Sequence, residues 1–240
     1  MVLLKRIINF SIILSLLLLV SCAGQDYNAE GKKLISKEKY EEAIKYLDKA
    51  ISENPNDYTA INNKGVALYY LGKIDESIEY YDKAIEIDPN KTDAYSSKGL
   101  SLDKQGKYEE AIELCNKAIE IDSSNGEAHL NKGHALLQLK EYEEALQEIN
   151  MAEKIIDNNS EVYGNKANAL YMLGAYPEAI EYYNKQLKLK PNSIDALYNI
   201  GLAYNKNGEN ENAIKAFKSV LKINPNDEMA KASLDILENN

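Results

Sequence analysis

The stretch YTAINNKGVALYYLGKIDESIEYYDKAIEIDPNK, residues 58–91, decides the fold of this 240-residue chain. Small and apolar side chains recur at three- and four-residue spacing in its second half, which predicts an amphipathic helix over residues 74–87. Apolar residues within 61–71 predict another helix, and Gly72 is a favoured residue at a helix C-terminus. Pro89 ends the second helix because proline cannot donate the backbone hydrogen bond. The stretch therefore predicts two helices joined by a tight turn.

The same 34-residue pattern recurs from Gly24 onward without an insertion. Its six units are residues 24–57, 58–91, 92–125, 126–159, 160–193 and 194–227. Position 8 of each unit is small: Gly31, Gly65, Gly99, Gly133, Ala167 and Gly201. Position 11 is large: Leu34, Leu68, Leu102, Leu136, Leu170 and Tyr204. Position 20 is small again: Ala43, Ser77, Ala111, Ala145, Ala179 and Ala213. Small side chains at positions 8 and 20 let the paired helices touch closely, which offsets the cost of about 1 kcal/mol for glycine inside a helix.

This pattern resembles the tetratricopeptide repeat, and the resemblance covers 204 of the 240 residues. It implies an all-α fold, a right-handed superhelical solenoid of six helix-turn-helix repeats in which each pair is stabilised by its neighbours. Residues 228–240 are expected to form a closing helix, with Ala230, Leu234 and Leu237 on its inner side. Asp235 stands where a seventh unit would need its small residue, so no seventh unit is expected.

Residues 1–21 have the features of a signal peptide. Lys5 and Arg6 precede a run of 14 mainly apolar residues, which is short for a membrane span of roughly 20. The sequence Leu19-Val20-Ser21-Cys22 resembles the lipobox of bacterial lipoproteins. In that family the peptide is cut before the cysteine, and both the thiol and the new amine are acylated. The alternative interpretation is an ordinary secretory signal in which Cys22 has no such role.

The lipobox resemblance implies Cys22 as the lipidation site and residues 22–23 as a lipidated N-terminus. More than one acyl chain is also what stable anchoring requires. Ala23 and Gly24 follow the cysteine, in place of the aspartate that retains enteric lipoproteins on the inner membrane. We therefore expect a lipid-anchored protein of the cell envelope, on the periplasmic side of the outer membrane where the cell has one.

Composition argues against nucleic-acid binding. The chain has 28 Lys+Arg and 38 Asp+Glu, a formal net charge of −10, and Arg6 is its only arginine. Removal of residues 1–21 takes Lys5 and Arg6 and no acid, which leaves 26 against 38, or −12. A nucleic-acid binder needs a basic face to displace counterions from phosphates, so we expect no nucleic-acid partner.

The histidines, the cysteine within the repeats and the paired glutamates are residue types that often carry catalysis, but here we expect them to have structural roles. His129 and His134 lie five apart on one predicted helix, hence about 140° apart around it, and cannot chelate one metal. His129 and Cys115 occupy large aromatic or apolar positions of the repeat, so we expect core packing and an inert thiol. Paired glutamates recur in the first turn of a helix, where negative charge is favourable: Glu41-Glu42, Glu109-Glu110 and Glu143-Glu144. With no phosphate loop, nucleophile triad or metal motif, we expect no enzyme, cofactor or small-molecule substrate.

The family resemblance also implies a binding scaffold, in which positions 2, 5, 6, 9, 12 and 13 of the first helices face a ligand in a concave groove. Position 6 is Asn63, Asn131, Asn165 and Asn199 in four units. An amide has a donor and an acceptor, so it can pair with a peptide unit. We expect each of these amides to be accessible, without a protein partner, and to bond the backbone of an extended segment. The alternative is that they hold helices together.

Other residues are expected to add contact area to the groove: Tyr69, Tyr171 and Tyr198, with Asn168 and Met172. At position 7, lysine replaces the leucine of the repeat pattern in four units: Lys64, Lys98, Lys132 and Lys166. A lysine can cover apolar surface with its stem and keep its charge in water, and this is the favoured interpretation. The alternative is a row of ammonium groups suited to an acidic peptide.

These observations predict an envelope scaffold that binds an extended segment of another protein in its groove. Similar arrangements serve as pilus-assembly pilotins, as subunits of outer-membrane protein insertion machinery and as adaptors for cell-wall hydrolases, and the sequence does not choose among them. The alternative is a structural subunit of an envelope assembly machine that uses its outer helical faces.

Overall fold

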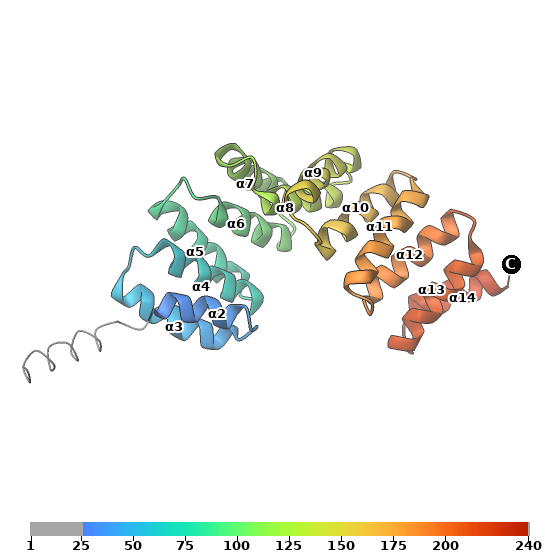
Figure 1. Ribbon diagram of the computed structural model, residues 1–240, viewed down its shortest axis with the longest axis horizontal. Coiled ribbons are helices and arrows are strands. Elements are labelled where there is room, and N and C mark those ends of the chain that lie inside the picture. The colour runs from blue at the N-terminus through green and yellow to red at the C-terminus, as the bar shows by residue number, and fades with distance from the viewer. Residues whose placement is uncertain (1–25, 240) are drawn as a thin grey trace, which may run out of the picture.

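The computed structural model describes residues 26–239, and this part of the chain folds into thirteen α-helices without a strand (Figure 1). Twelve of the helices form six pairs: α2 (Tyr27–Ile35) with α3 (Tyr40–Glu53), α4 (Tyr58–Tyr70) with α5 (Ile74–Ile87), α6 (Thr92–Lys104) with α7 (Tyr108–Ile121), α8 (Gly126–Gln138) with α9 (Tyr142–Ile155), α10 (Ser160–Met172) with α11 (Tyr176–Leu189), and α12 (Ile194–Lys206) with α13 (Asn210–Ile223). A last helix, α14 (Glu228–Glu238), closes the array. The expected signal peptide, residues 1–21, and the expected lipidation site Cys22 lie outside the described residues.

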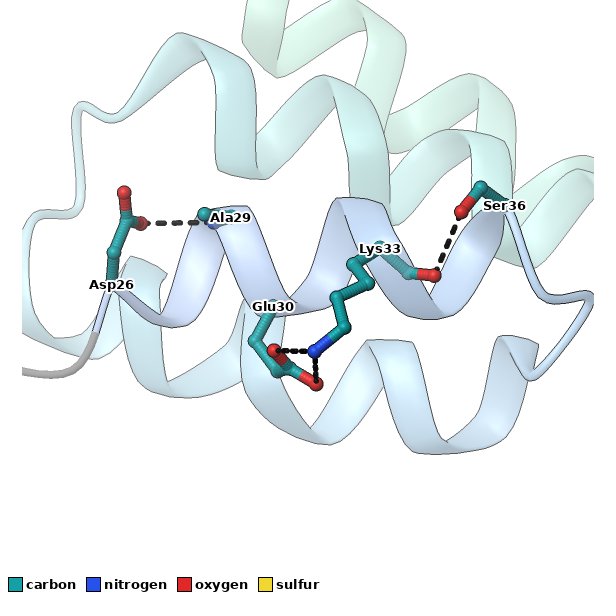
Figure 2. A network of polar contacts seen from close by, with 5 residues as sticks. All are labelled: Asp26, Ala29, Glu30, Lys33 and Ser36. Carbon is teal, nitrogen blue, oxygen red and sulfur yellow. Dashed lines mark hydrogen bonds and ion pairs between the residues drawn. The ribbon is translucent and has the colours of Figure 1, made fainter.

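Five of the six pairs start where a short polar side chain caps the first helix, and the exception is α6, which follows Lys91. Asp57, Asn125, Asn159 and Ser193 precede α4, α8, α10 and α12, and each accepts a hydrogen bond from a backbone N–H of the helix that follows. Such caps satisfy backbone donors that the helix itself leaves without a partner. In Figure 2 the same cap is visible on α2, where Asp26 accepts from the Ala29 N–H at 2.9 Å.

The turn within each pair depends on a left-handed residue at position 15 of the unit. Glycine occupies this position in four units, with φ between 76° and 80°: Gly72, Gly106, Gly174 and Gly208. Glu38 and Lys140 adopt the same conformation, with φ of 59° and 65°. A side chain is disfavoured in this region of backbone space, which explains the preference for glycine. The expected helix stop at Gly72 is confirmed.

The paired helices touch at position 8, as the small residues there predicted. A Cβ atom built on Gly65 would lie 2.6 Å from a ring carbon of Tyr81, and one on Gly133 would lie 2.6 Å from Cγ1 of Ile149. The partner side chains occupy position 24 of each unit and are fully buried or nearly so: Leu47, Tyr81, Cys115, Ile149, Tyr183 and Phe217. In five units the buried residue of position 24 therefore packs on the bare backbone of the glycine at position 8, and in the fifth unit position 8 is Ala167.

The pairs follow one another along an arch, with α6 and α8 on its inner side and α7 and α9 on its outer side (Figure 1). First helices of neighbouring pairs also contact one another, from α2–α4 to α10–α12. At the end of the arch, α14 buries Ala230 and Leu234 against α13, while Lys231 and Asp235 are exposed, as expected for a closing helix. None of the helices within residues 26–239 is long and apolar enough to cross a membrane.

Candidate functional site

Three hollows lie along the inner side of the arch, and we call the surface that contains them the inner groove. The first hollow has a volume of about 340 Å³ and the second about 300 Å³. They share Tyr69 of α4, Leu100 of α6, Leu130 and Asn131 of α8, and Glu161 of α10. Only a curved array can bring four first helices to one hollow, because each helix pair packs mainly on the next pair. The third hollow, of about 230 Å³, lies between α10 and α12.

The lining of the hollows follows the repeat register. Every residue around the second hollow stands at position 2, 5, 6, 9, 12 or 13 of its unit: Tyr69, Leu100, Asp103, Lys104, Leu130, Asn131, His134, Glu161 and Asn165. The first hollow adds Tyr81, Ile156 and Asn159 from outside this set. Ile156 and Asn159 belong to the connection between α9 and α10, and no feature of the sequence pattern had marked them.

The asparagines of position 6 are not alike, and the expectation that they all lack a protein partner is wrong for three of them. Asn63 donates to the side-chain oxygen of Asn28 at 3.1 Å. Asn131 donates to the backbone oxygen of Ser96, also at 3.1 Å. Both bonds reach back to position 5 of the preceding unit, so these amides join neighbouring first helices.

The other two asparagines have more freedom. Asn199 makes a long contact of 3.5 Å to the side-chain oxygen of Asn168. Asn165 has no hydrogen-bond partner among residues 26–239, is partly exposed and lines the second hollow. Of the four, Asn165 is therefore the amide that is ready to bond a ligand.

The third hollow contains several of the expected groove residues. Asn168, Tyr171, Met172 and Asn199 line it, and Met172 is exposed. Tyr198, which we expected in the groove, lies elsewhere: its ring packs on another aromatic ring of the core, and its hydroxyl is 3.3 Å from Oγ of Ser233 in α14. This tyrosine connects the last repeat to the closing helix and lines none of the three hollows.

The lysines of position 7 form ion pairs with acids of the second helices, so both interpretations of them were wrong. Lys98 contacts Asp82 at 2.5 Å and Lys132 contacts Glu148 at 2.6 Å. Lys64 pairs with Asp48, and Lys166 with Glu153. Between 13 and 21% of each lysine side chain is exposed, so the charges are neither free in water nor displayed in the groove.

The choice of acid follows from the neighbouring unit. Lys64 and Lys98 reach an aspartate at position 25 of the preceding unit. The third and fourth units have Asn116 and Asn150 at that position, so Lys132 and Lys166 turn to glutamates at other places on α9. A partly buried ammonium group needs a counter-charge, and it takes the one within reach.

The histidines occupy different environments. His129 is buried, as expected for its position; its Nδ1 lies 2.6 Å from Glu148 and its Nε2 lies 3.2 Å from the backbone oxygen of Ser123. Burial tends to raise the pKa of Glu148, but hydrogen bonds from Lys132 and His129 outweigh it and lower that pKa. No group of three or more metal-binding side chains comes together among residues 26–239.

His134 lines the second hollow, and its Nδ1 lies 3.0 Å from a carboxylate oxygen of Asp103. This hydrogen bond raises the pKa of His134, and the charges of Asp103 and Glu161 act in the same direction against the effect of burial. Cys115 is fully buried, as predicted, and burial raises the pKa of its thiol to about 12, which disfavours the reactive thiolate.

Comparison with known proteins places this geometry in a family. Models of the tetratricopeptide repeat match residues 27–57, 58–91, 80–113, 104–169 and 194–227, and a model described as TPR repeat matches 167–208. The chain belongs to the tetratricopeptide repeat (TPR) family. Proteins of this family are generally interaction scaffolds and not enzymes, and the fold supports such a role here.

Solved structures show similar arrays. YrrB, described as a TPR protein with an unusual peptide-binding site, is 25% identical, with a TM-score of 0.62 over 79% of this chain and 97% of YrrB. PilF of Pseudomonas aeruginosa is 19% identical, with a TM-score of 0.75 over 89% of this chain and 96% of PilF. PilW, a type IV pilus biogenesis factor, is 17% identical, with a TM-score of 0.76 over 87% of this chain and 96% of PilW. The search of curated proteins gives no match.

Proposed function

We propose that this protein is a lipid-anchored, non-catalytic scaffold of the bacterial cell envelope that binds an extended segment of another protein in its inner groove. The observation that carries the proposal is the run of three hollows along one face, lined by first helices of five repeats. Such a surface offers apolar contact and hydrogen-bonding groups in a line, which suits an extended chain better than a compact small molecule.

Two further observations support a peptide ligand. Asn165 presents an amide inside the groove that has no hydrogen-bond partner within the described part of the chain, residues 26–239. YrrB, the array 25% identical to this chain, is described as having a peptide-binding site. Neither observation names the partner, which on this proposal is a protein.

The anchor is proposed from the sequence of the leader. The charged start, the apolar run and the residues Leu19–Cys22 come in the order that lipoprotein processing requires. Cys22→Ala should abolish incorporation of labelled palmitate and leave the leader uncleaved in cells. Incorporation of the label by this variant would contradict the proposed lipid anchor and leave the proposal of a peptide-binding groove unaffected.

Photocrosslinking in intact cells tests the groove itself. A photoreactive phenylalanine analogue replaces Leu100, which lines both the first and the second hollow, or Met151, which lies exposed on α9. We expect a specific crosslinked partner from position 100 and none from position 151. A partner captured only from position 151 would show that the outer surface, and not the groove, is used.

A structural role in an assembly machine is the second candidate. Ile155, Leu189 and Ile223 share position 30 of the last three units, at the ends of α9, α11 and α13, and are 39, 43 and 41% exposed. An apolar row of this kind, repeated along the array, is a surface on which another subunit could pack. Sedimentation of the purified chain distinguishes the two candidates, because self-assembly at micromolar concentration favours the structural role.

A further inference from the structure

Among residues 26–239, the side chains that line the first hollow of the inner groove include two carboxylates and no basic group. Glu127 and Glu161 both stand at position 2 of their units, in the first turns of α8 and α10, and both are exposed. Neither carboxylate group forms an ion pair or accepts a hydrogen bond among residues 26–239; the backbone N–H of Glu161 donates to Asn159. Elsewhere this chain places a lysine beside many of its acids, as in Lys33 with Glu30 on α2 (Figure 2).

The helix dipole explains why a glutamate is tolerated in the first turn of a helix. It does not explain why two such glutamates, 34 residues apart in the sequence, face one hollow without a cation. Two like charges at one site repel each other, and this cost is relieved when a positive group binds between them.

Two tyrosines of α4 form part of the same hollow. Tyr69 is half-buried and Tyr70 is 58% exposed, and their rings pack edge to face with centroids 5.4 Å apart. The pKa of Tyr70 is raised, first by its burial and also by the charges of Tyr40, Glu161 and Glu127. The tyrosine rings and the carboxylates therefore lie close enough to act on one ligand group.

Elsewhere in this chain, a lysine fills the space between a tyrosine ring and a carboxylate. Lys166 lies 4.4 Å from the centre of the Tyr182 ring and pairs with Glu153. Lys64 lies 4.4 Å from the centre of the Tyr80 ring and also pairs with an aspartate. In both places a lysine takes an aromatic ring and a carboxylate together. The first hollow has the rings and the carboxylates, and no lysine of its own.

We propose that the first hollow binds the arginine or lysine side chain of an extended segment, with the cation between Glu127 and Glu161 and its stem against Tyr69, Tyr70 and Leu100. The inference rests on the proposed function, because it names the side chain that the groove selects. A basic segment replaces the acidic peptide that the lysines of position 7 had suggested, because those lysines already form ion pairs with acids of the protein. The amide of Asn165, in the adjoining second hollow, is then available to bond the backbone of the segment.

A random dodecapeptide library displayed on phage tests the proposal, with the full chain in detergent as the target. We expect the selected peptides to share an arginine or lysine at one aligned position. Enrichment of peptides without a basic residue, or of peptides with acids there, would refute this inference and leave the proposed function standing. Failure to enrich any peptide would refute the proposed function, and this inference with it.

Fluorescence anisotropy with a selected peptide measures the contribution of the two glutamates. The double variant Glu127→Gln with Glu161→Gln should bind about tenfold more weakly or worse, because it loses both counter-charges. The control Glu143→Gln with Glu144→Gln removes the same charge from the first turn of α9, on the outer side, and should bind normally. Equal weakening by both variants would show a general charge effect and overturn the proposal.

A neutral replacement of the basic residue in the peptide, combined with the double variant of the protein, gives a double-mutant cycle. Citrulline for arginine, or norleucine for lysine, should weaken binding to the wild-type chain and have little effect on binding to the double variant. Melting curves show whether the glutamine variants are folded, and each single variant can be measured if the double variant is not. Independent losses, which add when both partners are changed, would show that the basic side chain binds elsewhere.

Discussion

Gly99→Leu is the most direct test of how this array is held together. A Cβ atom at residue 99 would lie 3.0 Å from Sγ of Cys115 and 3.3 Å from the backbone oxygen of Ala111. Ordinary contacts between such atoms are about 3.5–4.0 Å, so even one added carbon presses α6 away from α7. Leucine adds three more carbons in the direction of a fully buried thiol.

The expected loss is that of an overpacked core, about 1–3 kcal/mol or more. For a chain of this length each kcal/mol lowers the melting temperature by about 2–4 °C, which predicts a fall of roughly 2–12 °C. Stability here is a sum of neighbour terms, so hydrogen exchange should speed up most in the third unit and less in the units that flank it.

A second substitution shows whether the clash is the cause. Cys115→Ala by itself leaves a small cavity and should destabilise the chain. Combined with Gly99→Leu it makes room for the new side chain, so the double variant should be more stable than the sum of the two losses predicts. Calorimetry on the four proteins measures this coupling. An unchanged melt for Gly99→Leu, or strictly additive losses, would mean that the two helices do not meet at this position.

Three further predictions concern single positions. Lys140 has a φ of 65° where four other units have glycine, so Lys140→Gly should raise the free energy of unfolding by about 0.5–1 kcal/mol in denaturant titrations, and a loss would contradict the turn argument. Asn131→Ala should cost about 0.5–1.5 kcal/mol because it removes an inter-repeat hydrogen bond, whereas Asn165→Ala should leave the melt unchanged and weaken binding of a groove peptide; the reverse result would exchange their roles. The pKa of His134 is raised by Asp103, so NMR should show this histidine titrating above about 6.5. The stability that it contributes is fully present below that pH and is lost as the pH rises through the pKa of the folded state. This pH-dependent contribution should be missing in His134→Gln.

The pH should also affect how tightly the inner groove binds a basic side chain. His134, Asp103, Lys104 and Glu161 face the second hollow together. Protonation of His134 adds a positive charge beside Glu161, which the first hollow shares. A basic ligand side chain should therefore bind more weakly at pH 5.5 than at pH 8, and His134→Gln should flatten this dependence.

The sequence alone was enough to predict the helix pairs, their order and the closing helix. The signals for these are local: a 34-residue period, small residues at position 8, and a glycine or polar residue at most helix ends. Each of them acts within one unit or between adjacent units, so the order of residues along the chain carries the information. The buried thiol of Cys115 and the buried ring of His129 were predictable for the same reason.

The functions of individual polar residues were decided only by the tertiary structure. Asn131 donates to the backbone oxygen of Ser96, whereas Asn165 has no hydrogen-bond partner among residues 26–239, although both stand at position 6 of the repeat. Whether the position 7 lysines face water depends on which acid the adjacent second helix offers. The meeting of Tyr69 from the second unit with Glu161 from the fifth depends on the curvature that accumulates over four repeats. A repeat pattern specifies each step of the superhelix, but long-range contacts arise from the sum of many small steps, and no single unit contains that sum.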